Sequence, residues 1–372
     1  MNGGKSKARV AVLYHGESEW LGDAEPFQSA GKVLMRSQID YDVVPMDGLK
    51  DGQLDGETIH IGNAAYDCLL VASCEKMTGE YADVLLKLLK LGFCIRFVDC
   101  LPTIIDADVV FPQDLLIENE SVVSFIREKG LVSVETDKYV PWLRYYQYEN
   151  AGFTVHMFFN ESPNAGIDTL LQKKFSLDYE YDAQQNLLYD AVYTNGEFTL
   201  KLEPGEARVF IQTEAQYSKS SASAIDLLRK NEQMAMDELT DWKILLADFR
   251  TPDLFEVMEG ISKLEDIASL KPDFSGTICY ETVLYQEEVS SCKILDLGEA
   301  YEAAEVIING ISAGTCISGP YIYQVSNLLK VGDNHLCIKV ETTLGYSQKD
   351  MMSLMGMFEP LGMLGPVKIY SK

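Results

Sequence analysis

Hydrophobic residues in the first third of the chain come in short, almost unbroken runs, which are ARVAVLY at 8–14, DCLLVASC at 67–74 and CIRFVDC at 94–100. Such runs are typical of strands that are buried on both faces of a parallel sheet. Segments with helical spacing of their apolar residues alternate with them, at 26–34, 78–91 and 121–130. This alternation predicts a doubly wound α/β domain over residues 1–137.

From Trp142 onward, apolar and polar residues alternate with a period of two, which predicts antiparallel strands with one face on a core. The residues expected to face this core include Phe153, Val155, Met157 and Phe159, then Phe198, Leu200 and Leu202, then Ala207, Val209 and Ile211. His156 falls on the opposite face of its strand, where a solvated or internally satisfied imidazole is expected rather than a ligand-binding one. Residues 138–213 are therefore predicted to form a small antiparallel β-sandwich.

A polar, Ser-rich stretch that leads into helix-forming residues predicts a linker and helix over 214–238. Beyond it, the alternation returns at 277–284 and 335–341, and Asn309-Gly310 gives a strong two-residue hairpin signal. Many short strands of this kind predict a β jelly roll over 239–372. The Met-rich segment 351–366 is expected to pack over that core.

Composition and charge narrow the range of partners. The 372 residues carry a net charge of −26, which opposes binding to nucleic acid and to anionic membrane surfaces. No apolar stretch approaches the roughly 20 residues of a membrane helix, and MNGGKSKARV lacks the apolar core of a secretory signal, so a cytoplasmic location is expected.

The eight cysteines lie mostly in apolar, strand-like runs, which favours free thiols in a reducing compartment. With no CxxC pair and only four scattered histidines, a zinc site of the usual spacing is not indicated. No cofactor is predicted. A calcium ion among the acidic loops stays open, because oxygen-ligand sites need not follow a fixed motif.

The first candidate site follows the first predicted strand. In a flavodoxin-like (class I glutaminase-like) sheet, ligands bind beyond the carboxyl ends of the strands. There the polar loop 15–20 carries His15, Glu17, Glu19 and Trp20, which could bind a sugar through indole stacking and carboxylate acceptors. The alternative is a solvated loop whose Trp20 packs on its own domain.

The sequence of the same domain can be compared with the motifs of several enzyme classes. A glutaminase nucleophile at Cys74 would need flanking glycines and a later histidine in the domain, and neither is present. The first strand is followed by no GxGxxG motif or P-loop. His15-Gly16-Glu17 has the H-x-E spacing of a zinc deaminase, but the P-C-x-x-C partner is missing. The α/β domain is therefore expected to be non-catalytic.

The last third of the chain carries a series of short motifs in order, at residues 295–298, 304–310, 313–315, 320–321 and 332–336. Together they resemble the sugar-binding, galactose-binding-like jelly roll of glycoside hydrolase family 2. Residues 359–366 are similar to the closing segment of this domain in large rhamnosidase-like proteins. The first domain has its own resemblance, carried by residues 11–15, 19–20 and 37–45. These segments are similar to the flavodoxin-like domain of glycoside hydrolase family 106, the α-L-rhamnosidases. Tyr321 and Tyr323 lie two apart in this jelly roll and could form a sugar-stacking platform, or both could belong to the core.

The resemblance implies that the family's catalytic residues and a calcium ion lie in a preceding (β/α)₈ barrel, which needs about 250 residues. We therefore expect an accessory C-terminal region of a glycosidase whose partner is that barrel, or else a shorter natural relative that lost it. A stand-alone carbohydrate-binding protein is the main alternative. A further alternative is a role in assembly, since the flavodoxin-like domain lies at subunit contacts in related galactosidases. Another is an autonomous glycosidase, which would need two suitably spaced carboxyl groups.

Overall fold

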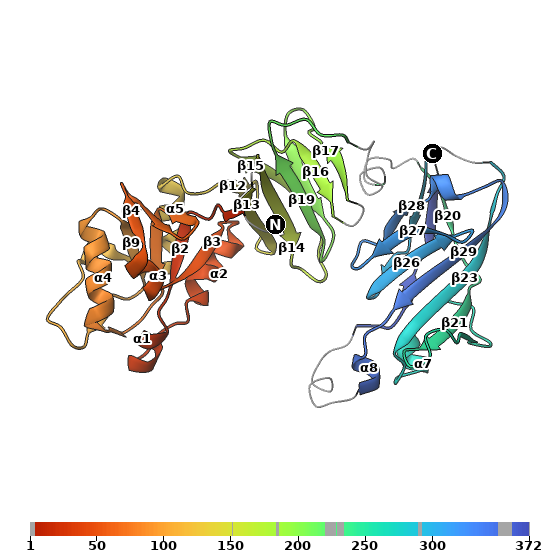
Figure 1. The fold of residues 1–372 in the computed structure, drawn as a ribbon, viewed down its shortest axis with the longest axis horizontal. Helices are drawn as coiled ribbons and strands as arrows, with labels where there is room; N and C mark the ends of the chain where they lie inside the picture. Colours follow the sequence, from red (N-terminus) through yellow and green to blue (C-terminus); the bar gives the residue numbers. More distant parts are fainter. Residues whose placement is uncertain are drawn as a thin grey trace. The chain divides into compact units, whose positions relative to one another are not determined.

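The computed structural model describes residues 4–150, 152–183, 186–219, 228, 234–288, 292–348 and 359–371. Residues 1–181 with 190–218 form one compact unit, and residues 182–189 with 219–372 form the other (Figure 1). Most of the predicted linker and helix, and Met351–Phe358 of the Met-rich segment, lie outside the described residues. The end of the predicted helix is a strand, β20 (Ala235–Glu238).

A parallel five-stranded sheet organises the first part of unit 1, as the apolar runs predict. Its strand order is β11-β9-β7-β2-β3. In chain order the strands are β2 (Val10–Tyr14), β3 (Tyr41–Pro45), β7 (Cys68–Val71), β9 (Cys94–Val98) and β11 (Leu116–Ile117). The helices are α1 (Gly16–Leu21), α2 (Gln28–Arg36), α3 (Met46–Asp51), α4 (Gly79–Lys90) and α5 (Val122–Glu128).

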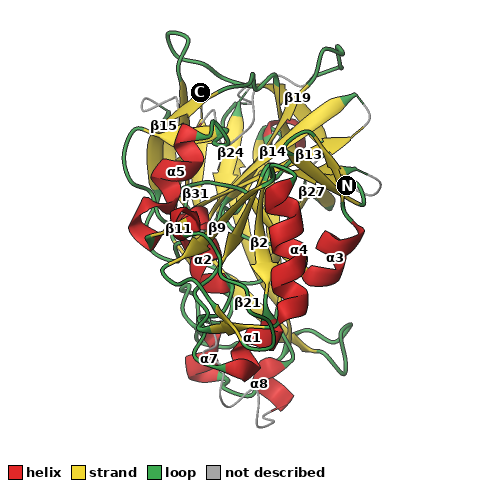
Figure 2. Cartoon of the chain, turned by 90° about the vertical axis from the view of Figure 1, so that its left-hand side faces the viewer, coloured by secondary structure: helices red, strands yellow, loops and turns green. Residues whose placement is uncertain are grey.

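Each face of this sheet has its own core, because successive side chains of a strand point to opposite faces. Val10 and Val12 pack with residues of α2 and α5, whereas Ala11 and Leu13 pack with residues of α3 and α4. Figure 2 shows these helix pairs on opposite sides of the sheet. Helix α4 begins as its sequence predicts, since the Thr78 hydroxyl accepts a hydrogen bond from the Tyr81 N–H at 3.4 Å.

Short strands extend the edges of this region. β4 (Gln53–Asp55), β5 (Thr58–Ile61) and β6 (Ala64–Tyr66) form a small antiparallel sheet. β8 (Lys76–Met77) pairs in parallel with β10 (Thr103–Ile104), beyond the carboxyl ends of β7 and β9. This second pairing brings together two of the loops that follow the sheet.

Two antiparallel sheets, made mostly of the remaining residues of unit 1, share a core. One has the order β1-β13-β14-β19-β16-β17, and the other β12-β15-β18. The strands are β1 (Lys5–Ser6), β12 (Val134–Thr136), β13 (Leu143–Asn150), β14 (Phe153–Asn160), β15 (Ile167–Lys173), β16 (Tyr179–Asp182), β17 (Leu187–Asp190), β18 (Phe198–Leu202) and β19 (Ala207–Gln212). Strands β1 and β12 belong to these sheets by pairing, although the sequence pattern assigns their residues to the α/β domain.

The buried faces of β14 and β19 are the reverse of the predicted ones. On β14, His156, Phe158 and Asn160 are buried while Val155 and Met157 are only half-buried, and on β19 the buried residue is Phe210. The polar residues on the inner face have internal partners: the Asn160 side-chain amide donates to the carbonyls of Ala165 and Glu203 at 2.8 and 3.0 Å. Polar side chains can be buried in a core when their hydrogen bonds are satisfied. The apolar pattern alone therefore predicted the wrong buried face for these two strands.

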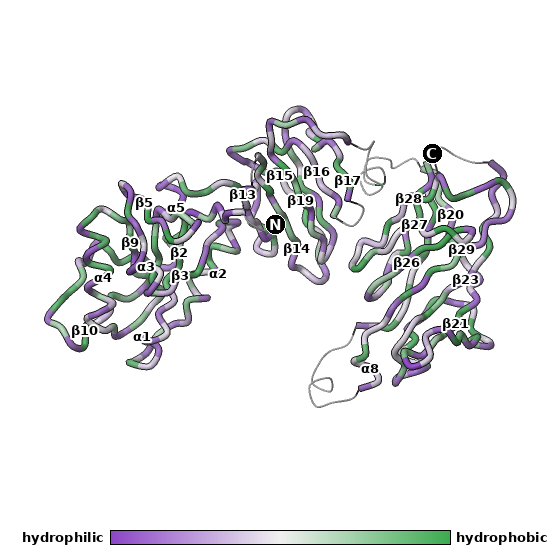
Figure 3. The backbone as a smooth tube through the Cα atoms, viewed as in Figure 1, coloured by the Kyte–Doolittle hydropathy of each residue, from purple (hydrophilic) through white to green (hydrophobic). Residues whose placement is uncertain are grey.

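Unit 2 also contains two antiparallel sheets around one core, with hydrophobic and hydrophilic stretches along their strands (Figure 3). The larger has the order β22 (Glu256–Val257), β21 (Lys243–Asp248), β23 (Gly276–Gln286), β29 (Gly332–Glu341), β26 (Ala303–Ile308) and β27 (Ile311–Cys316). The smaller has the order β20, β31 (Lys368–Ser371), β24 (Lys293–Asp296) and β28 (Ile322–Gln324), and β25 (Glu299–Ala300) pairs with β30 (Met363–Gly365). Among the described residues of unit 2 there are also two short α-helices, α7 (Ile267–Leu270) and α8 (Gly345–Gln348).

The predicted hairpin at Asn309-Gly310 is confirmed. Both residues have positive φ, at 52° and 82°, and Ile308 pairs with Ile311 across the turn. As for membranes, none of the helices within the described ranges has the length and apolar character to span a bilayer.

Candidate carbohydrate-contact site

The first candidate site follows β2 at the carboxyl edge of the parallel sheet. The segment predicted as a polar loop is in fact the short helix α1, and His15 is the residue between strand and helix. The helix brings Glu17 and Glu19 into its first turn, where carboxylates interact favourably with the helix dipole. All four predicted residues of this segment are therefore neighbours, but their environments differ.

His15 is fully buried and serves the structure of the loop. Its Nδ1 lies 3.2 Å from the Leu13 carbonyl oxygen, and its Nε2 lies 3.0 Å from the Glu25 carbonyl oxygen. These contacts tie the end of β2 to the start of the segment that leads into α2. Neither ring nitrogen is directed at solvent, so His15 positions the loop and does not contact a ligand.

Trp20, by contrast, is 87% exposed, which contradicts the alternative that it packs on its own domain. Glu17 and Glu19 are exposed as well. They are two residues apart on α1, and positions i and i+2 of a helix do not face each other. The two carboxylates are therefore not placed as a facing acid and base pair.

The loops around Trp20 hold one another in place through backbone hydrogen bonds. The Glu25 N–H donates to the Ser73 carbonyl, and the Glu75 N–H donates to the Asp23 carbonyl, both at 2.8 Å. On the loop after β10, Ile105 and Val110 are 49% and 84% exposed. The carboxyl edge thus presents apolar side chains among acidic ones on interlocked loops.

The cysteine at this edge is not an activated nucleophile. Cys74 is fully buried, and burial raises the pKa of its thiol to about 11, although a hydrogen bond with Ser18 works in the opposite direction. A nucleophilic cysteine needs a lowered pKa and access to substrate. The structure thus agrees with the rejection of Cys74 on sequence grounds.

Tyr321 and Tyr323 lie in unit 2 and are buried, at 6% and 3% exposure. The Tyr321 hydroxyl donates to the Glu302 carbonyl, and the Tyr323 hydroxyl donates to the Ala304 carbonyl, each at 2.6 Å. A stacking platform needs an exposed ring face, so the positions of both rings fit the core alternative and not the platform. Burial raises the pKa of Tyr321 to about 12.

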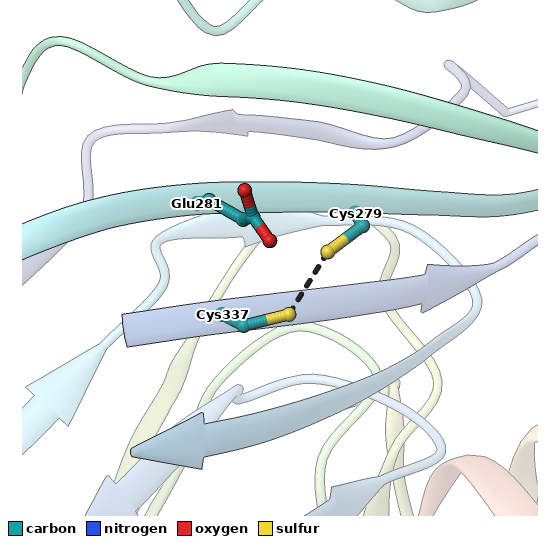
Figure 4. A group of neighbouring side chains, drawn as sticks. All are labelled: Cys279, Glu281 and Cys337. Carbon is teal, nitrogen blue, oxygen red and sulfur yellow. Dashed lines mark hydrogen bonds between the residues drawn. The ribbon is translucent and has the colours of Figure 1, made fainter. Parts of the chain in front are cut away.

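A third group of candidate ligands, which the sequence analysis did not identify, lies in unit 2. It consists of Cys279, Glu281 and Cys337 (Figure 4). The period-two pattern places Cys279 and Glu281 on one face of a strand, but the pairing of β23 with β29 brings Cys337 beside them. All eight cysteines are free thiols in the structure.

No protein-family model matches the sequence, and no curated protein matches it. Among solved structures, a rhamnosidase from Novosphingobium sp. PP1Y aligns with 99% of this chain at a TM-score of 0.66 and 16% sequence identity. The two share a fold. The alignment covers 39% of the rhamnosidase, so this chain spans well under half the length of that enzyme.

Weaker similarities involve other glycoside hydrolases. An exo-carrageenase of glycoside hydrolase family 42 from Bacteroides ovatus matches 56% of this chain and 29% of its own at a TM-score of 0.39 and 10% identity. A β-glucuronidase from an uncultured Clostridium species matches 38% of this chain and 30% of its own at a TM-score of 0.30 and 20% identity.

Proposed function

We propose that this chain is the non-catalytic, C-terminal region of a longer glycoside hydrolase of the α-L-rhamnosidase type, in family 106, that acts on plant or microbial glycans. The observation that carries the proposal is the similarity to the rhamnosidase, which extends over 99% of this chain but 39% of the other. In this proposal, the catalytic acid and base lie in a (β/α)₈ barrel of about 250 residues outside this chain.

The proposal assigns a type to each part of the fold. The α/β part is flavodoxin-like, supported by the strand order β3-β2-β7-β9-β11, which is the order 2-1-3-4-5 of that fold. The two antiparallel sheets of unit 2 form a galactose-binding-like jelly roll, supported by their common core and the Asn309-Gly310 hairpin.

The surface around α1 is the proposed contact with the barrel. Trp20 on α1 exposes a large apolar side chain, and Ile105 and Val110 do so on the loop after β10, whose partner strand β8 contacts α1. Exposed apolar side chains of this kind are the ones that a partner surface can bury. The interlocked loops would give the barrel a rigid face to pack on, because their backbone groups are already paired. Support of the barrel is therefore the main role that we propose.

The second candidate function is carbohydrate binding by this chain alone, and the exposure of Trp20 favours it. An indole with a free face can stack on the C–H groups of a sugar, while Glu17 and Glu19 accept hydrogen bonds from hydroxyl groups. Calcium is proposed as an optional ligand of either function and is therefore included in the test.

The experiment is hydrolysis of a panel of aryl glycosides, including the α-L-rhamnoside, by the purified chain at high concentration, with and without calcium. We expect no turnover of any substrate. Turnover that Glu17→Gln or Glu19→Gln abolishes would contradict the proposal and make α1 part of an active site. Calorimetric titration with rhamnose and rhamnose-containing oligosaccharides separates the two candidates, since only the second requires binding by this chain.

A further inference from the structure

Two cysteines and a glutamate meet on the outer face of the larger sheet of unit 2. In the antiparallel pair β23 and β29, Glu281 is directly opposite Cys337, and Cys279 is opposite Lys339. The Sγ atoms of Cys279 and Cys337 are 2.9 Å apart, and one ligand atom from each of the three residues lies within 4.8 Å of the others. Figure 4 shows the two sulfur atoms and the Glu281 carboxylate gathered on the same side of the strands.

The three side chains have the chemistry of a soft-metal site. Zn²⁺ binds thiolate sulfur at about 2.3 Å and carboxylate oxygen at about 2.0–2.2 Å, in a tetrahedron. Two thiolates on one such ion are separated by about 3.8 Å, so the sulfur atoms would move apart by roughly 1 Å on binding. Small rotations of two cysteine side chains on paired strands can provide that movement.

The two thiols share one hydrogen bond, in which either sulfur atom can be the donor. The hydrogen bond with Cys279 lowers the pKa of Cys337, and the charge of Lys339 also lowers it, whereas burial and the charges of Glu281 and Glu305 raise it. The pKa of Cys279 is raised, first by its hydrogen bond with Cys337. Metal binding requires thiolate ligands, so the pair would release protons as an ion binds.

The group is open on one side. Cys279 is buried, whereas Cys337 and Glu281 are partly exposed and line a surface hollow of about 530 Å³ together with His335 and Asp241. Glu281 also pairs with Lys243, with Nζ and Oε2 3.0 Å apart, but both side chains are about half exposed and such a pair is worth little. An ion could therefore enter from solvent and keep a fourth position for water or another ligand.

We propose that Cys279, Cys337 and Glu281 form a binding site for a thiophilic divalent cation, with Zn²⁺ as the expected ion. The proposal does not depend on the glycosidase assignment, because it uses only contacts within one sheet. A disulfide between the same cysteines is the competing outcome, and the experiment distinguishes the two.

The chain contains a matched control. Cys68 and Cys94 also lie side by side on paired strands, with their Sγ atoms 3.7 Å apart. Within the described ranges, the only group of three or more ligating side chains that could hold a metal ion is Cys279, Glu281 and Cys337, so the Cys68 and Cys94 pair lacks a third ligand.

The test titrates the reduced chain with Co²⁺, whose bond to thiolate gives a charge-transfer absorption, and then displaces it with Zn²⁺. We expect one ion per chain, with both thiols contributing to the absorption. Cys337→Ser should weaken Zn²⁺ binding at least about 100-fold, and Glu281→Gln about tenfold, while Cys94→Ser leaves it unchanged. Circular dichroism checks that each variant is folded.

A second measurement uses the wild-type chain, so its result does not depend on whether a variant folds. Bound Zn²⁺ should protect Cys337 from alkylation, read by peptide mass, while exposure of Cys100 to the reagent stays the same. The proposal is overturned if the reduced chain gives no cobalt–thiolate absorption, if Cys337→Ser retains it, or if Cys94→Ser removes it. It is also overturned if the purified chain holds Cys279 and Cys337 as a disulfide and the chain binds no Zn²⁺ after that disulfide has been reduced.

Discussion

The edge of the parallel sheet around α1 and the region of strand β28 in unit 2 were the two candidates for presenting aromatic residues to a sugar, each with a packed alternative. At the first, Trp20 is 87% exposed. At the second, Tyr323 is 3% exposed, and its hydroxyl both donates to the Ala304 carbonyl and accepts from the Cys316 N–H at 3.3 Å. One region offers an aromatic surface, whereas the other uses aromatic rings to join its two sheets.

The difference teaches what the spacing of aromatic residues can and cannot predict. A spacing of two places Tyr321 and Tyr323 on the same side of an extended segment, but it does not say which side faces the core. In unit 2 a second sheet covers that side, and backbone carbonyls are available to the phenol hydroxyls. Helix α1 has only six residues and buries only Ser18, and its tryptophan is left exposed by the part of unit 1 that the structure describes.

Among the substitutions that test this comparison, Tyr323→Ala should have the largest effect on stability. Removal of a buried aromatic ring leaves a cavity and an unpaired carbonyl, so the free energy of unfolding should fall by about 3–5 kcal/mol. Chemical denaturation followed by circular dichroism measures the change. Tyr323→Phe keeps the ring and removes only the hydroxyl, and it should cost about 1 kcal/mol. Loss of sugar affinity at unchanged stability would instead restore the platform interpretation.

Burial of a titratable ring makes the stability of the fold depend on pH, and His156 is such a ring. Its Nδ1 lies 3.0 Å from the Tyr145 hydroxyl, its Nε2 lies 3.2 Å from Gln212 Oε1, and its ring stacks on Phe175. Burial lowers the pKa of His156 from 6.5 to about 4, against a smaller opposite effect of the Gln212 hydrogen bond. Between these two values, the unfolded chain binds a proton that the folded chain does not.

Stability that depends on neutral His156 should therefore be complete above pH 6.5 and be lost as the pH falls toward 4. The expected loss is on the order of 2–3 kcal/mol, measured as the difference between the wild type and His156→Gln at each pH. Comparison with the variant is needed because burial raises the pKa of Asp40 to about 7, which makes the folded chain less stable as the pH rises from 3.8 to 7. Equal pH dependence in both proteins would show that His156 is solvated.

Much of the fold can be predicted from the sequence because local patterns determine it. Strand β2 is buried on both faces, as its unbroken apolar run predicts, and α4 begins at the capping residue Thr78. The inner faces of β14 and β19 could not be predicted, because they depend on partners that are distant in sequence. Gln212 and Tyr145 satisfy His156, and the carbonyls of Ala165 and Glu203 satisfy Asn160.

The candidate sites divide in the same way. The sequence places His15, Glu17, Glu19 and Trp20 after the first strand, where the structure has them, but it does not reveal that His15 points inward to two carbonyl oxygens. The Cys279, Glu281 and Cys337 group depends on which strands are neighbours in the sheet. Strand pairing brings together residues that are far apart in the sequence, and no local pattern encodes it.

The smallest effect on stability is expected from Trp20→Ala, and this prediction tests the comparison most directly. Because the indole is exposed, its removal should change the free energy of unfolding by less than about 0.5 kcal/mol. If the second candidate function holds, the same variant should lose sugar affinity by about tenfold, measured by calorimetric titration. The control is Trp142→Ala, a change at a tryptophan that is 49% exposed, which should leave the affinity intact. A loss of stability near that of Tyr323→Ala would mean that Trp20 is part of a core, and the contrast between the two regions would disappear.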